Sequence, residues 1–135
     1  MWRTVFIAAA CGALVAQAAS AENEAGAQEY MVACAGCHGE TGKGDGPLAG
    51  LLEIDTPDLT ALAADAGGAF PFAATLQLID GRNEVRAHGS AMPVWGDRYF
   101  VGAATDDGRD PAQSDLVARG RMLTLVDYLA SIQAE

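Results

Sequence analysis

The chain has 135 residues, half of them apolar, so it can build one domain with a real core but not several. Its formal charge at pH 7 is −10, from eighteen acidic residues against eight Lys and Arg. Proteins that bind nucleic acids need a basic face, so this charge argues against nucleic acid as a partner. A charged surface on this protein would be acidic, and it either guides partners or keeps the protein soluble.

The N-terminus has the pattern of a secretory signal. Arg3 precedes an almost unbroken apolar stretch that ends in the small residues Ala19-Ser20-Ala21. The stretch is short for a membrane span, so we predict that residues 1–21 are removed and that residues 22–135 form a single soluble domain, exported to the periplasm. A competing cleavage site ends at Ala18, and an uncleaved membrane anchor remains the alternative.

The segment after the signal predicts one helix and one loop. Residues 23–35 are mostly helix formers, with Tyr30, Met31 and Cys34 on one face. Residues 36–50 are so rich in glycine that neither a regular helix nor a strand is expected there.

Two short helices are expected next. The first opens at Asp58 and is stopped by Gly67-Gly68. The second covers residues 72–79 and is closed by Asp80-Gly81.

The last third predicts a loop and a closing helix. Residues 87–111 contain four glycines and two prolines and predict a second extended loop. Ser114 is the expected N-cap of a helix that runs to about Ile132, with Gly120 as its one weak position. Its apolar surface is expected from Leu116, Leu123, Val126, Tyr128, Leu129 and Ile132. Nothing alternates with period two, so the expected fold class is all-α.

The chemistry of the chain is concentrated in Cys34-Ala35-Gly36-Cys37-His38, the C-x-x-C-H pattern of covalent haem attachment. Two thiols one helical turn apart can each add to a vinyl group on one edge of a porphyrin. The histidine that follows is then held beneath the iron as its proximal ligand. We therefore predict one covalent haem c on Cys34 and Cys37, with His38 bound to the iron.

Two other uses of a cysteine pair remain as alternatives. A thioredoxin-type redox pair needs a βαβ context, which the sequence lacks. A structural zinc site needs four ligands, and the mature chain offers only Cys34, Cys37, His38 and His88, of which two are direct neighbours.

The second axial ligand is expected to be Met92. It lies in the loop 89–96, which can wrap over the opposite haem face, and Pro93 holds this loop extended. His88 is the rival ligand, and an ordinary core methionine is the other interpretation of Met92.

The haem propionates need polar partners near this loop. The candidates flank the loop, and each could equally be an ordinary surface residue: Arg82, Arg86, Trp95 and Tyr99.

Together these residues resemble the class I bacterial cytochromes c, from about Gly26 to Ile132. The likeness rests on the attachment motif, on the loop Gly42-Lys43-Gly44-Asp45-Gly46-Pro47 after it, on Met92-Pro93-Val94-Trp95-Gly96, and on helix-crossing residues at both ends: Gly26, Tyr30, Leu125 and Tyr128. The resemblance implies a small cytochrome c fold in which the first and last helices cross and glycine-rich loops surround one haem. It also implies that the Pro47 carbonyl accepts a hydrogen bond from His38. The stretch Asp106–Pro111 departs from the most compact members and looks like a surface insertion.

With both axial positions filled, the iron has no site for a substrate, so the expected function is one-electron transfer between a redox donor and an acceptor rather than catalysis. Two alternatives stay open. One is a haem enzyme or sensor with a replaceable sixth ligand, and the other is a dedicated redox subunit of a larger dehydrogenase or oxidase complex.

Overall fold

The computed structural model describes residues 23–82, 92–106 and 108–134, and within these ranges the secondary structure is helical, with no strand. A first helix occupies residues 23–33. The remaining elements follow in the order α2 (Ala35–His38), η1 (Ala49–Leu51), η2 (Leu59–Ala61), α3 (Leu62–Asp65), α4 (Phe72–Asp80), α5 (Trp95–Asp106) and α6 (Pro111–Ser131). The predicted all-α fold is confirmed. The predicted signal sequence, residues 1–21, lies outside the described residues.

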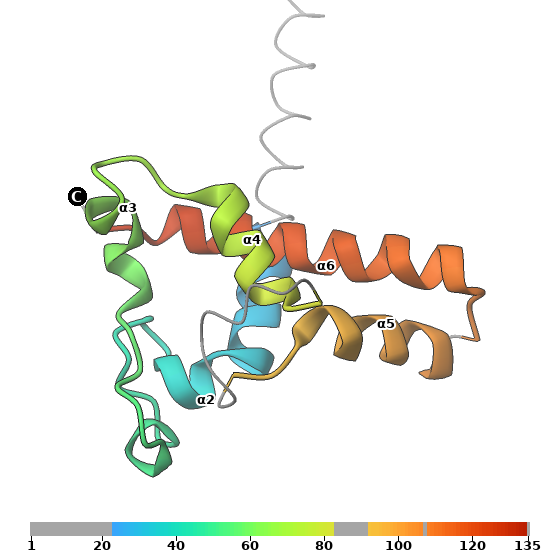
Figure 1. Ribbon diagram of the computed structural model, residues 1–135, viewed down its shortest axis with the longest axis horizontal. Helices are drawn as coiled ribbons and strands as arrows, with labels where there is room; N and C mark the ends of the chain where they lie inside the picture. Colours follow the sequence, from blue (N-terminus) through green and yellow to red (C-terminus); the bar gives the residue numbers. More distant parts are fainter. Residues whose placement is uncertain (1–22, 83–91, 107, 135) are drawn as a thin grey trace, which may run out of the picture.

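The longest helix among the described residues, α6, contacts both α5 and α4 (Figure 1). It runs along one side, with α5 beside it and α4 packed near its middle, and the first helix passes beneath it. The chain between α2 and α3 forms a separate loop region away from α5. No helix in the described ranges is both long enough and apolar enough to cross a membrane.

The first helix and α6 cross at close range, as the resemblance implied. A Cβ atom at Gly26 would overlap the Thr124 carbonyl oxygen and would lie 2.7 Å from Cβ of Tyr128. The rings of Tyr30 and Tyr128 are 5.3 Å apart, and Tyr30 is fully buried. Glycine is therefore required at position 26 because the two backbones nearly touch there. Met31, expected on the same face as Tyr30, is instead exposed.

Helix α6 begins earlier than expected, and its expected apolar face is confirmed only in part: Val126 and Leu129 are buried, and Tyr128 and Ile132 pack against the core. Its N-cap is Asp110 rather than Ser114: the carboxylate accepts bonds from the amides of Ala112 and Gln113, and Pro111 supplies the first turn. Leu116 and Leu123, expected in the apolar face, are exposed at 72% and 41%. The face that α6 buries consists of Ser114, Ala118, Met122, Leu125, Val126 and Leu129.

The predicted loop over 87–111 is wrong in its second half, because residues 95–106 form α5. Gly96 and Gly102 lower the helix propensity of this stretch, but burial of Tyr99 and Ala103 along α6 outweighs that cost. Gly96 also has a packing reason, since a Cβ there would collide with Asp80 and would lie 2.5 Å from Nε of Arg82.

The loop predicted over residues 36–50 is wrong at its start, because residues 36–38 belong to α2. The other expected elements are confirmed with small shifts. Asp58 caps η2 by accepting from the Thr60 amide, and η2 leads directly into α3. Gly67 and Gly68 follow α3 with positive φ. Gly81 ends α4 in the left-handed conformation (φ 62°). Asp106–Pro111 connects α5 to α6, and its described residues are exposed or half-buried.

Candidate functional site

The C-x-x-C-H segment forms its own short helix, α2, directly after the first helix. The amides of Cys37 and His38 both donate to the Cys34 carbonyl, at 3.1 and 2.9 Å. The chain leaves this helix at Gly39, whose φ of 80° reverses its direction. Both thiols are free of disulfide bonds, and Cys34 is buried.

A cleft opens beside α2. Both cysteines and His38 line it, and Met92 lines the same cleft from a segment far along the chain. The remaining wall is largely apolar and consists of Ala33, Leu52, Ile54, Asp55, Thr56, Pro57, Pro93 and Trp95. The fold therefore gathers the predicted attachment cysteines and both predicted axial ligands around one apolar space.

Burial also determines the state of Cys34 in this cleft. Removal from water, followed by the influence of Glu29 and Cys37, raises the pKa of the Cys34 thiol to about 12. At neutral pH the folded chain without a thioether at this position holds Cys34 as an unreactive thiol.

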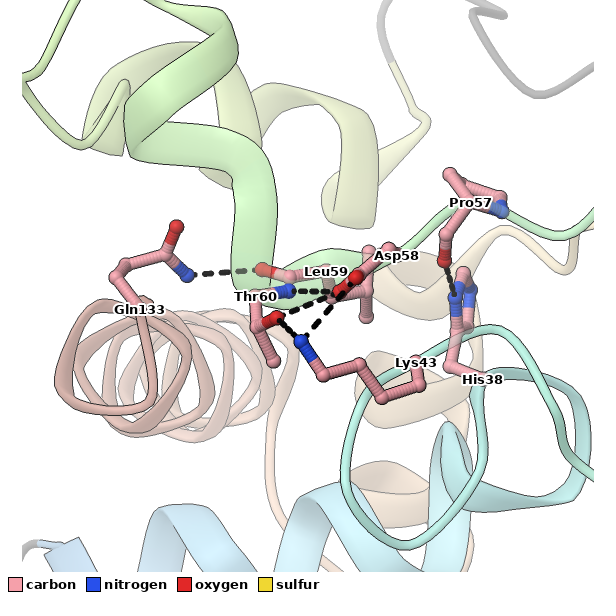
Figure 2. A network of polar contacts seen from close by, with 7 residues as sticks. All are labelled: His38, Lys43, Pro57, Asp58, Leu59, Thr60 and Gln133. Atoms are coloured by element: carbon pink, nitrogen blue, oxygen red, sulfur yellow. Dashed lines mark hydrogen bonds and ion pairs between the residues drawn. The ribbon is translucent and has the colours of Figure 1, made fainter. Parts of the chain in front are cut away.

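His38 is buried, and its ring is oriented by a backbone carbonyl. Nδ1 donates a hydrogen bond to the Pro57 carbonyl oxygen at 3.1 Å (Figure 2). Since a carbonyl oxygen can only accept, Nδ1 carries the proton and Nε2 carries the lone pair that a metal ligand needs. The bond also increases the basicity of the imidazole.

The acceptor implied by the resemblance, Pro47, is therefore wrong. The loop turns back on the motif before it reaches Pro47: the Gly44 amide donates to the His38 carbonyl at 2.8 Å, and the Gly46 amide donates to the Cys37 carbonyl at 3.0 Å. These bonds hold that part of the loop against the backbone of α2, and Pro47 is exposed. The chain reaches the His38 ring only on its return, at Pro57.

The structure separates the predicted propionate partners. Trp95 lines the cleft. Tyr99 lies one turn further along α5, with its ring centroid 5.7 Å from that of Trp95, and its buried hydroxyl has no hydrogen-bond partner among the described residues. The Arg82 guanidinium is held by two carboxylates, Asp80 at 2.5 Å and Asp115 at 3.0 Å, which raise its pKa. Arg86 and the rival ligand His88 lie outside the described residues.

Sequence reasoning did not identify Thr56. It lines the cleft, and its buried hydroxyl has no partner within the described ranges. An unsatisfied hydroxyl in the wall of an apolar cleft suits a ligand that is mostly apolar but carries polar groups at one edge. A single threonine in a loop has no sequence signal that would have pointed to this.

A family model for cytochrome c matches residues 23–110, from the first helix through Met92 to the connection before α6. The chain belongs to the cytochrome c family. No curated protein and no solved structure matches it significantly.

This cytochrome c carries covalently attached haem c and transfers electrons. The described residues fit that cofactor: two free cysteines, a histidine in the right tautomer and an unpartnered hydroxyl face one apolar cleft. Bound there, the haem iron supplies the site at which a single electron is gained or lost. The chain itself supplies attachment, orientation of the imidazole and exclusion of water. Across the described residues, no group of three or more His, Cys, Asp or Glu side chains is placed to hold a metal ion.

Proposed function

We propose that this protein is a monohaem one-electron carrier with His38 and Met92 as axial ligands, and that it shuttles between a donor and an acceptor in the periplasm. The observation that carries the proposal is the meeting of His38 and Met92 in one cleft with both attachment cysteines. Two protein ligands leave no exchangeable position on the iron, which favours electron transfer over substrate chemistry. An apolar cleft also disfavours the more highly charged ferric form.

Absorption spectroscopy of the oxidised protein tests the ligation. A thioether bound to ferric iron gives a weak far-red charge-transfer band, which we expect in the wild type and not in Met92→Ala. Met31→Ala is the matched control, because Met31 is exposed on the first helix and should leave the band unchanged. A wild-type protein that lacks the band and binds carbon monoxide readily would instead support a haem enzyme or sensor.

The distribution of charge indicates what the partners look like. Residues 23–65, which include the attachment motif and the loop region, contain eight carboxylates and one lysine. That lysine, Lys43, is already paired with Asp58 at 3.3 Å. The donor and the acceptor are therefore expected to present basic faces to this region.

Small redox complexes can test the sign of this field without a known partner. We expect a cationic one-electron oxidant to react faster than an anionic one of similar driving force. The difference should shrink as salt is raised, because the screening length falls to about 10 Å at 0.1 M salt. Equal rates at low salt would contradict an acidic docking face.

Export and independence need separate measurements. N-terminal sequencing of the haem-containing protein from a periplasmic fraction should begin near Glu22, as expected if residues 1–21 are removed. Gel filtration of the native extract should show the haem absorbance at the size of a single small domain. Co-elution with a larger complex would favour a permanent redox subunit.

A further inference from the structure

The Pro57 carbonyl, which accepts the hydrogen bond from His38, lies in a segment that is held by a network of polar contacts. Electron transfer by itself does not explain this network. Pro57 is followed by Asp58, and one Asp58 carboxylate oxygen accepts from both the amide and the hydroxyl of Thr60, at 2.8 and 2.7 Å. Lys43 Nζ donates to the same Thr60 hydroxyl at 2.5 Å and to the other Asp58 oxygen at 3.3 Å (Figure 2). The Thr60 hydroxyl therefore accepts a hydrogen bond from Lys43 and donates one to Asp58, so it acts both as acceptor and as donor.

The same segment also forms hydrogen bonds with two other parts of the chain. The Leu59 amide donates to the Gly42 carbonyl at 2.7 Å, which joins it to the loop that follows His38. Gln133, just after α6, donates to the Leu59 carbonyl and accepts from the Ala63 amide, both at 2.8 Å. The Ala134 amide donates to the Thr60 carbonyl at 2.8 Å. The backbone that includes the Pro57 carbonyl is thus fixed between the post-motif loop and the C-terminus.

Stability alone is a weak reason for this arrangement. The side chains of Lys43 and Asp58 are 50% and 38% exposed, and exposed ion pairs of this kind contribute little to folding. Thr60, in contrast, is only 6% exposed, and it lies three residues after the carbonyl that orients the His38 ring. Hydrogen bonds from Thr60, with a smaller effect of Lys43, lower the pKa of the Asp58 carboxyl, so it is an ionised acceptor at neutral pH.

We propose that Lys43 and Thr60 are positioning residues that act through Asp58 to hold the Pro57 carbonyl against Nδ1 of His38. The inference rests on the axial ligation of His38 in the proposed function. When the Pro57 carbonyl is held close to Nδ1, the His38 imidazole stays electron-rich and stabilises the ferric state of the iron. Loosening the network weakens this bond, exposes the Nδ1 proton to exchange and shifts the equilibrium toward the ferrous state.

The test uses the haem-containing protein and Thr60→Val, which removes one hydroxyl without changing charge. NMR of the reduced protein follows exchange of the His38 Nδ1 proton, and a redox titration follows the ferric–ferrous equilibrium. We expect exchange to be faster by about tenfold and the equilibrium to favour ferrous iron by about fivefold, the scale of one ordinary hydrogen bond. The matched control is Thr75→Val, because Thr75 is also 6% exposed and its hydroxyl donates to the Pro71 carbonyl in α4, away from the cleft. It should leave both quantities unchanged.

Lys43→Met is a second test variant, and it changes an exposed side chain instead of a buried one. Its control is Arg119→Met, which removes one exposed cation from an ion pair with Asp115 on the outer side of α6. Faster Nδ1 exchange in Lys43→Met and not in Arg119→Met supports the proposal. If Thr60→Val and Lys43→Met behave like their controls while the wild-type His38 signals show the shifts of an iron ligand, the positioning role is overturned and the ligation stands. Wild-type His38 signals without those shifts would overturn the ligation, and the inference with it.

Discussion

The loop region over residues 39–61 and the helix pair α5–α6 are held together by different interactions. In the loop region the backbone bonds are scattered, and Gly39, Gly42 and Gly44 take positive φ values close to 80°. In α5–α6 the bonding is regular, and buried side chains such as Tyr99, Met122 and Leu125 pack between the helices. The first arrangement borders an apolar cleft that its own side chains do not fill, whereas the second completes its own core.

The ion pairs also differ between the loop region and the helical side of the molecule. Glu29 on the first helix and Arg121 on α6 form a two-point pair at 2.6 and 2.9 Å, and the Arg121 guanidinium lies 4.2 Å from the Tyr99 ring centroid. Asp115 on α6 binds both Arg82 and Arg119. The loop region has only the pair of Lys43 with Asp58 among the described residues. We conclude that the helical side is stabilised by the chain alone, and that the loop side needs the haem to complete its core.

Loss of the haem should give the largest difference between the two regions. In Cys34→Ser/Cys37→Ser, which cannot form thioethers, we expect a stability loss of several kcal/mol, roughly 3–5, because the cleft becomes an empty apolar cavity. Amide hydrogen exchange should show the loop-region amides, such as that of Leu59, without protection, and residual helicity confined to the first helix, α5 and α6. A cooperative melt like that of the holoprotein would contradict the division.

Gly26→Ala should produce the next largest effect, on the helical side. The new Cβ would overlap the backbone of α6 at Thr124, which cannot move aside as a flexible side chain could. We expect a loss of about 3 kcal/mol in chemical denaturation of the holoprotein. Gly102→Ala is the control, because a Cβ there meets only an Asp106 oxygen at 3.8 Å, and it should be neutral or slightly stabilising. Equal effects of the two variants would mean that the helices do not cross closely.

Acid should weaken both regions, each through one carboxylate. Hydrogen bonds from Thr60 lower the pKa of Asp58, and bonds from Arg119 and Arg82 lower that of Asp115, both from an ordinary value of 3.8. A carboxyl with a lowered folded-state pKa contributes stability above its unfolded pKa and loses it as pH falls through the folded value. Denaturation midpoints measured from pH 5 down to about 2 should therefore fall less steeply in Asp58→Asn and in Asp115→Asn than in the wild type.

The two carboxylates can then be distinguished. In the wild type, protonation of Asp58 should loosen the segment that carries the Pro57 carbonyl and so change the exchange of the His38 Nδ1 proton. Only Asp58→Asn should remove this acid-induced change, because Asp115 contacts Arg82 and Arg119 and not that segment. Identical exchange profiles in the two variants would argue against a link between Asp58 and His38.

Gly120→Ala should give the smallest effect, and a favourable one. Gly120 lies on the exposed side of α6, and a Cβ added there would meet no atom within 4 Å, so alanine gains helix propensity without a clash. We expect a gain of about 0.5–1 kcal/mol in denaturant unfolding. Gly67→Ala is the control: it also has open space, but its φ of 85° strains any L side chain, so it should destabilise.

Several features were predictable from the sequence because they depend on neighbouring residues. The attachment motif needs only the spacing of Cys34, Cys37 and His38, and helix ends at Gly67 and Gly81 need only local backbone conformations. The meeting of Gly26 with Tyr128 was available through the family resemblance, since a glycine and an aromatic residue mark such crossings.

Other features depended on where distant segments meet, and tertiary structure alone decided them. Helix α5 forms despite its glycines because α6 offers a surface to pack against, which local propensity does not record. The acceptor for His38 is Pro57 rather than Pro47 because the loop bonds first to the backbone of α2, and a backbone carbonyl has no signature in sequence. The residues that hold this carbonyl, Lys43, Thr60 and Gln133, come from three separate parts of the chain. Chemistry carried by one short segment is therefore determined by the sequence itself, whereas the orientation of that chemistry depends on long-range contacts that only the folded chain brings together.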